Sequence, residues 1–145
     1  MNSQSENNLK KKIIEEMTVD YGSALEKNFD IAKQLIRITK DGKIDVLYKD
    51  RLTGKESISL YLIGKLYAKE ADLTTTKDAG NNELMDELGV PKGSILPWIK
   101  ELRDDNRIKT ISKGRFTYHT IAPNVVERSL KEIIKKINRG GDDDD

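Results

Sequence analysis

The stretch Gly89–Thr120 reads GVPKGSILPWIKELRDDNRIKTISKGRFTYHT, and it changes from a helical to a strand pattern near Asn106. Before Asn106, apolar residues recur at the spacing that gathers side chains on one face of an α-helix. These residues are Ile95, Ile99 and Leu102. After Asn106, apolar residues flank a polar turn at 112–115, as in a two-stranded hairpin. They are Ile108, Ile111, Phe116 and Tyr118. The stretch predicts a helix that leads directly into a hairpin with a basic tip.

Residues that favour helix ends set the boundaries around this stretch. Ser94 is expected to cap the helix at its start, with Pro97 in the first turn, where a missing N–H has no partner to lose. Asn106 tolerates the left-handed conformation that ends a helix. Upstream, Asn81 or Asn82 is expected to cap a brief helix that ends at Gly89.

Further helices are expected on both sides. A wide apolar stripe predicts a buried helix over Glu56–Ala71, followed by a β-favouring segment at Leu73–Thr76. Two helices are expected between Leu9 and Ile36. Residues 43–55 fit either a strand and turn or an extension of a helix. The last helix, from Pro123, carries an apolar stripe with spacings of four and three. That stripe consists of Val126, Leu130, Ile133 and Ile137.

Charge is abundant but nearly balanced, since 35% of residues are charged and the net charge is +1. The segment 91–122 nevertheless holds seven basic and three acidic side chains, and Asp142–Asp145 offsets this excess. The chain has no cysteine and no apolar run long enough to span a bilayer. We therefore expect a cytoplasmic protein that is not inserted in a membrane.

No catalytic motif is present. The sequence lacks a phosphate-binding Gly-rich loop, a pair of histidines at ligand spacing and a nucleophile elbow. His119 is the only histidine, and its place on a strand favours a structural role. We expect no enzymatic activity, no cofactor and no metal.

The order helix, short strand, helix, turn, helix and hairpin resembles the winged helix-turn-helix family over roughly Lys55–Ala122. The resemblance rests on ELMDELGVPKGSILPWIKELRDDNRIK followed by SKGRFTYHT, in which Gly114-Arg115-Phe116-Thr117-Tyr118 matches the wing. It implies a mainly α fold with a small β-hairpin, in which a winged core is flanked by N- and C-terminal helices. It also implies a transcriptional regulator that binds double-stranded DNA. The segments expected are an N-terminal helical extension over 1–54, the winged core over 55–122, a helix over 123–139 and a disordered acidic tail over 140–145.

In this family the second helix of the motif enters the major groove and the wing lies along the backbone. The resemblance therefore implies that the start of the helix near Ser94 and the basic hairpin tip bind DNA, mainly through phosphates. The expected contacts are Lys92, Gly93, Ser94, Lys100, Lys109, Lys113 and Arg115. We also expect a homodimer whose interface is supplied by the segment from Leu9 to Ile36 and by the stripe of the last helix, although that stripe could instead pack on its own domain.

Leu96, Pro97 and Trp98 occupy the outward positions where readers of base sequence carry polar side chains. None of the three can form a bidentate hydrogen bond with a base edge. We therefore keep an alternative function, a winged helix that binds another protein through these three residues. Trp98 equally fits packing inside the domain.

Overall fold

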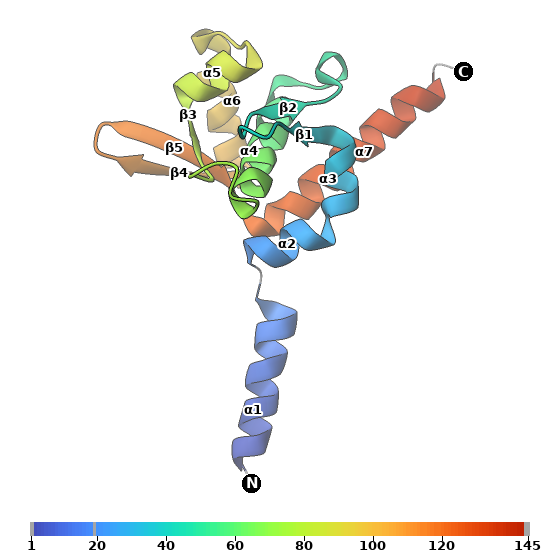
Figure 1. Cartoon of the computed structure of the whole chain (residues 1–145), viewed down its shortest axis with the longest axis vertical. Coiled ribbons are helices and arrows are strands. Elements are labelled where there is room, and N and C mark those ends of the chain that lie inside the picture. The colour runs from blue at the N-terminus through green and yellow to red at the C-terminus, as the bar shows by residue number, and fades with distance from the viewer. Residues whose placement is uncertain (1, 19, 144–145) are drawn as a thin grey trace.

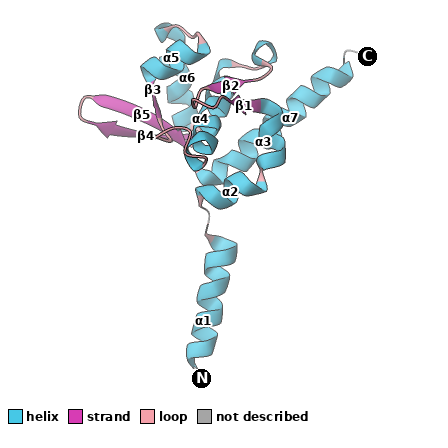
Figure 2. Ribbon diagram, in the orientation of Figure 1, coloured by secondary structure: helices cyan, strands magenta, loops and turns pink. Residues whose placement is uncertain are grey.

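The computed structural model describes residues 2–18 and 20–143, and Figures 1 and 2 show its elements. The protein is mainly helical, with two small antiparallel sheets. Helix α4 (Gly54–Glu70) lies in the middle of the fold, and every residue from Ser57 to Leu66 is buried. Because α4 is covered on all sides, its sequence is apolar around most of its circumference, as the expected buried helix required.

A capping box fixes the start of α4. The hydroxyl of Thr53 accepts a hydrogen bond from the N–H of Glu56 (3.2 Å), and the Glu56 carboxylate accepts one from the N–H of Thr53 (2.8 Å). Two N–H groups at the helix end are thereby satisfied. This is the reason that the chain turns at Thr53-Gly54 and then runs directly into the core.

One face of α4 is covered by a three-stranded sheet and two helices. The strands β3 (Ala79–Gly80), β5 (Phe116–Ile121) and β4 (Ile108–Lys113) pair in that order, all antiparallel. Helix α5 (Asn81–Leu88) follows β3, and α6 (Lys92–Asp104) precedes β4. The expected strand at Leu73–Thr76 is wrong. Between α4 and α5, the chain pairs with β5 later, at β3, where Ala79 lies opposite His119 and Gly80 opposite Tyr118.

Helix α6 begins earlier than its sequence suggested. Pro91, rather than Ser94, is the N-cap residue, and its carbonyl accepts hydrogen bonds from the N–H groups of Ser94 and Ile95 (both 3.0 Å). Pro97 therefore lies inside the helix and not in its first turn. The expected cap at Ser94 is wrong.

The far end of α6 and the hairpin match the expectation. Asn106 has φ 57°, its N–H donates to the carbonyl of Arg103 (3.0 Å), and the N–H of Arg107 donates to that of Leu102 (2.8 Å). This pair of bonds ends a helix in a left-handed turn. Strands β4 and β5 are then joined by a two-residue turn, Gly114-Arg115, in which Gly114 has φ 65°. Such a turn requires a residue that accepts positive φ.

A second hairpin packs on another part of α4. Helices α2 (Tyr21–Lys27) and α3 (Phe29–Leu35) lead into β1 (Ile36–Ile38), which pairs with β2 (Ile44–Val46). The expected continuation of a helix through Ile36 is wrong, because Ile36 and Ile38 alternate with Arg37 and favour a strand. Residues 43–53 contain the strand β2 and a single 3₁₀ turn, η2 (Lys49–Arg51), and residues 54 and 55 begin α4.

The last helix, α7 (Pro123–Asp143), crosses the body and packs against α4, α2 and α3. Its apolar stripe is part of the protein's own core, where Val126 and Leu130 are 0% exposed and Ile133 and Ile137 are 3% and 6% exposed. These four residues therefore cannot form the expected dimer interface, because α4 and its neighbours already cover them. The helix also continues beyond residue 139 to Asp143, and residues 144 and 145 lie outside the described part.

The N-terminal segment is arranged differently from the rest. Helix α1 (Asn2–Lys12) continues into the π-helical turn η1 (Ile13–Met17), and together they project away from the body (Figure 1). Among the described residues, no helix is long and apolar enough to cross a membrane.

Candidate nucleic-acid interface

A hollow of about 480 Å³ separates the start of α6 from the end of the β4–β5 hairpin. Lys92 enters it from the first residue of α6, and Arg115 enters it from the hairpin turn. Neither side chain forms an ion pair with another described residue. The helix start contributes a positive dipole end, with Gly93 exposed and Ser94 half-buried beside it. Two cations beside a helix N-terminus form an arrangement that suits a phosphate group.

The one carboxylate that lines this hollow is already neutralised. Glu83 accepts a hydrogen bond from the hydroxyl of Tyr61 (2.6 Å) and pairs with Lys65 (3.2 Å), whose side chain is only 9% exposed. Burial and, after it, the bond to Glu83 raise the pKa of Tyr61, so the phenol keeps its proton. The hollow therefore presents the charges of Lys92 and Arg115 with little opposition.

The other expected contacts do not gather at this hollow. Lys100 pairs with Asp104 one turn along α6 (2.8 Å), and Lys113 pairs with Asp78 (3.3 Å) while lying over the ring of Tyr118. Lys109 lines a separate hollow on the sheet. Of the seven expected contacts, the structure thus brings Lys92 and Arg115 together at the hollow. Gly93 and Ser94 follow Lys92 on α6 without lining the hollow, and the other three are separated from it or engaged elsewhere.

His119 fixes the hairpin relative to α5. It is 2% exposed, and its Nε2 lies 2.7 Å from the amide oxygen of Asn81 while its Nδ1 lies 2.8 Å from the hydroxyl of Thr110. Because an amide oxygen only accepts, Nε2 carries the proton and Nδ1 accepts from Thr110. Burial, and secondarily the charge of Arg103, lowers the pKa of His119 and favours this neutral form. The structural role expected for His119 fits this arrangement.

Two exposed apolar side chains lie at the hollow: Leu96 was expected as a contact only in the protein-binding alternative, and Phe116 was not expected as a contact. Leu96 is 45% and Phe116 60% exposed, and both line it. Trp98 points elsewhere, because a Cβ built on Gly54 would lie only 2.3 Å from its ring. Leu96, Pro97 and Trp98 therefore do not form a single surface patch, since Trp98 packs against the start of α4. The signal that could have indicated the exposure of Phe116 is its position beside the hairpin turn, opposite Lys113. Residues at the tip of a projecting hairpin are far from the core.

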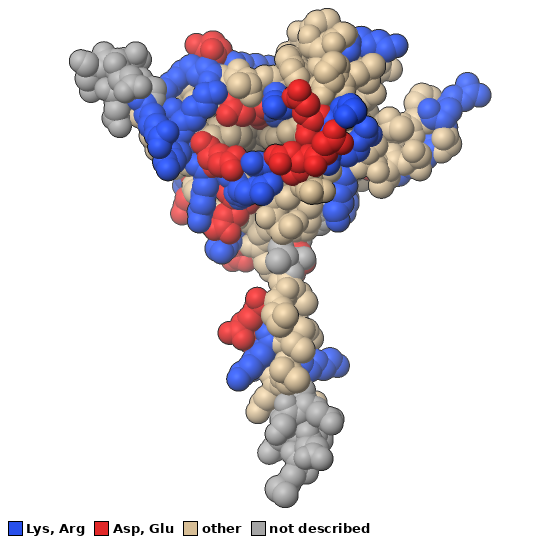
Figure 3. All heavy atoms as spheres, turned by 180° about the vertical axis from the view of Figure 1, so that it is seen from behind, with Lys and Arg blue, Asp and Glu red and all other residues tan. Residues whose placement is uncertain are grey.

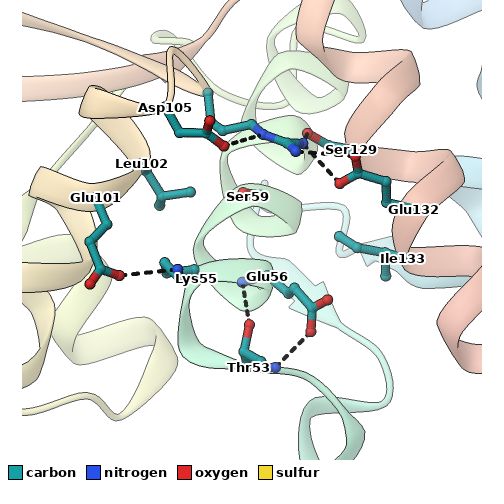
Figure 4. A pocket seen from close by; sticks show the side chains of 11 residues that line it. Thr53, Lys55, Glu56, Ser59, Glu101, Leu102, Asp105, Ser129, Glu132 and Ile133 are labelled. Atoms are coloured by element: carbon teal, nitrogen blue, oxygen red, sulfur yellow. Dashed lines mark hydrogen bonds and ion pairs between the residues drawn. The ribbon is translucent and has the colours of Figure 1, made fainter.

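A second hollow, of about 380 Å³, lies between the start of α4, the end of α6 and α7. Basic and acidic side chains alternate around a hollowed region in Figure 3, and Figure 4 shows this hollow from close by. Arg107 contacts Asp105 (3.0 Å), both oxygens of Glu132 (3.0 and 3.1 Å) and the hydroxyl of Ser129 (3.4 Å). Lys55 pairs with Glu101 (3.0 Å). These contacts hold α6 to α4 and α7.

Among the described residues, no cluster of side chains is arranged to bind a metal ion.

Comparisons of the chain with protein-family models, with curated proteins and with solved structures gave no match.

Proposed function

We propose that the protein is a winged helix DNA-binding module that regulates transcription, with α6 as the helix that enters the groove and the β4–β5 hairpin as the wing. The observation that supports this most is the shared hollow, which places the unpaired charges of Lys92 and Arg115 on either side of one space. Helix α6 and the hairpin would contact DNA at different points, so a space between them is needed for the duplex. Phosphate contacts would then fix the position of the protein along the duplex.

The order of the elements supports the same proposal. Helix α4, strand β3, helices α5 and α6 and the two strands of the hairpin follow one another as in a winged helix, with β3 closing the sheet beside β5. The hairpin stands out from the body in Figure 1, so its turn is accessible to a duplex. Leu96 and Pro97 are exposed on α6 and offer no base-specific hydrogen bond, so affinity comes mainly from the backbone of DNA and sequence selectivity is modest.

The test is a titration of the full chain against a fluorescent duplex of random sequence, repeated at several salt concentrations. Each phosphate neutralised releases close to one counterion, so the logarithm of the binding constant should fall steeply with the logarithm of salt. No binding at low salt, or an affinity that does not change with salt, would refute the proposal.

A contact with another protein is the second candidate, and the exposed Leu96 and Phe116 favour it. Because this surface is apolar, such a contact would be insensitive to salt. The alternative therefore no longer depends on Trp98. Replacement of Trp98 by alanine should lower the free energy of unfolding by up to about 3 kcal/mol, because its ring is partly buried against the start of α4, and should leave either surface in place.

A further inference from the structure

The projecting N-terminal segment exposes its apolar side chains. The exposed fractions are 60% for Leu9, 39% for Ile13, 55% for Ile14 and 76% for Met17. Met17, at the end nearest the body, also lines a hollow beside the sheet. The helix formed by α1 and η1 extends away from the body along its length in Figure 1. A run of exposed apolar side chains on one helix marks a surface that binds another molecule.

Leu9, Ile13 and Met17 follow one another every four residues. In an α-helix, four residues rotate about 40° more than one full turn around the helix axis. Side chains at this spacing therefore drift gradually around the helix. The turn η1 compensates for this drift, because its bond from the N–H of Thr18 to the carbonyl of Ile13 (3.1 Å) closes a wider turn with more residues. The three side chains therefore lie close to one line along the helix, with Ile14 beside them.

The charges on this helix are divided between its two halves. Lys10, Lys11 and Lys12 precede Ile13, whereas Glu15 and Glu16 follow it. If two copies of the helix lie antiparallel and cross near Ile13, the basic half of each lies along the acidic half of the other. A parallel pair would instead place like charges together, which is unfavourable.

We propose that two copies of the chain pair through α1 and η1 as an antiparallel, symmetric pair of helices. Ile13 meets its own symmetry mate on the twofold axis, and Leu9 of one copy faces Met17 of the other. A symmetric pair uses the same surface on both copies, as twofold interfaces require. The apolar stripe of α7 is buried in its own core, so the N-terminal helix offers the exposed helical stripe that a partner can cover. This pairing does not depend on whether the protein binds DNA.

The interface is small, because four apolar side chains per copy are buried on pairing. Interfaces below about 1,200 Å² are typical of weak or transient complexes. We therefore expect reversible association with a dissociation constant in the micromolar range or above. Sedimentation should then give a mass near 16.5 kDa in dilute solution and one approaching twice that value as the concentration rises.

Cysteine cross-linking tests both the contact and its direction, since the natural chain has no cysteine. A mixture of Leu9→Cys and Met17→Cys chains should form a mixed disulfide under mild oxidation, and Ile13→Cys should link to itself. Leu9→Cys alone and Met17→Cys alone should link several-fold more slowly than the mixture. Lys11→Cys is the matched control, because residue 11 lies about 200° around the helix from Ile13 and faces away from the interface.

Ile13→Asp provides a second test, with circular dichroism used to confirm that the body remains folded. It should keep the chain monomeric at concentrations where the natural chain associates. The proposal is overturned if the natural chain stays monomeric up to about millimolar concentration. It is also overturned if Leu9→Cys alone cross-links as fast as the mixture, which would indicate a parallel pair. A monomeric chain that binds anionic lipid vesicles and loses this binding on Ile13→Asp would assign the stripe to a membrane surface instead.

Discussion

The two β-hairpins of this protein differ in strand length, three residues against six, and lie in opposite surroundings. The β1–β2 hairpin packs on α4 with Ile36, Ile44 and Val46 buried, and it approaches so closely that Gly64 of α4 lies against Ile44. The β4–β5 hairpin packs into the core mainly at its base, where His119 and Ile121 are buried, and its tip extends into solvent. At this tip, no described atom other than those of Gly114 and its two chain neighbours lies within 4 Å of the position that a side-chain carbon on Gly114 would occupy.

This difference indicates which hairpin has a structural role and which is the better candidate for binding. A hairpin that buries one face contributes to the core, so its sequence is constrained by packing. A hairpin that projects contributes little to the core, yet it carries Phe116, which is 60% exposed, beside Arg115. Because such exposure is not required for stability, the tip of β4–β5 is the better candidate for binding. Changes in the two hairpins should accordingly affect different measurements.

The largest effect on stability is expected at the packed hairpin. In Gly64→Ala the new Cβ would lie 2.4 Å from the Cγ2 of Ile44, so β2 or α4 must shift. We expect the free energy of unfolding to fall by about 1–3 kcal/mol, as for overpacked cores. Gly93→Ala in α6 is the matched control, because, apart from its chain neighbours and the backbone of its own helix, no described atom lies within 4 Å of its Cβ position. Denaturant titration of both variants checks this, and equal stabilities would contradict the close packing.

A smaller, pH-dependent effect is expected at the base of the projecting hairpin. The lowered pKa of buried His119 means that the unfolded chain takes up a proton near pH 6.5 while the folded chain resists it. Stability is therefore complete above about pH 6.5 and falls below it, by at most about 1.4 kcal/mol per pH unit. In His119→Gln the titrating group is absent, so the decrease between pH 7 and pH 5 should be smaller. Denaturant unfolding curves of both proteins at pH 7 and pH 5 check this. An equal decrease in the two proteins would contradict the account, because it would mean that His119 takes up its proton in the folded state as readily as in the unfolded chain.

The smallest effect on stability is expected at the hairpin tip. Phe116→Ser removes a large apolar side chain that is already exposed, so the free energy of unfolding should change by less than about 0.5 kcal/mol. A loss above about 2 kcal/mol would show that the ring packs in solution and that the two hairpins do not differ as described. Thermal unfolding monitored by circular dichroism is sufficient for this comparison.

The sequence predicted the parts of the fold in which local signals agree. The period of α6, the left-handed residue Asn106 and the β4–β5 turn all act within a few residues, and each is found in the structure. The strand β1 was missed because Ile36 also continues the helical spacing of α3, and only its pairing with Val46 decides between the two. Tertiary context overrides local preference at such positions.

The candidate site was predicted less completely, for a related reason. Charge and position along the chain indicated seven contacts, but whether a cation is free depends on residues distant in sequence. Lys113 is paired with Asp78, which precedes it by 35 positions, and no local sequence pattern predicts this pair. The same limit applies to α7, since an amphipathic stripe does not reveal whether a partner or its own core covers it.

The most direct test of the proposed function compares charges removed from the two hairpin regions. Lys92→Ala/Arg115→Ala removes both cations of the hollow, whereas Lys40→Ala/Lys43→Ala removes two exposed cations from the turn of the packed hairpin. Affinity for a random duplex, measured by fluorescence anisotropy over a salt series, should decrease for the first variant, with a salt slope lower by about two counterions. The second variant should match the natural protein. If the two variants lose affinity equally, or if only the Lys40/Lys43 variant does, the hollow beside the projecting hairpin is not where DNA binds.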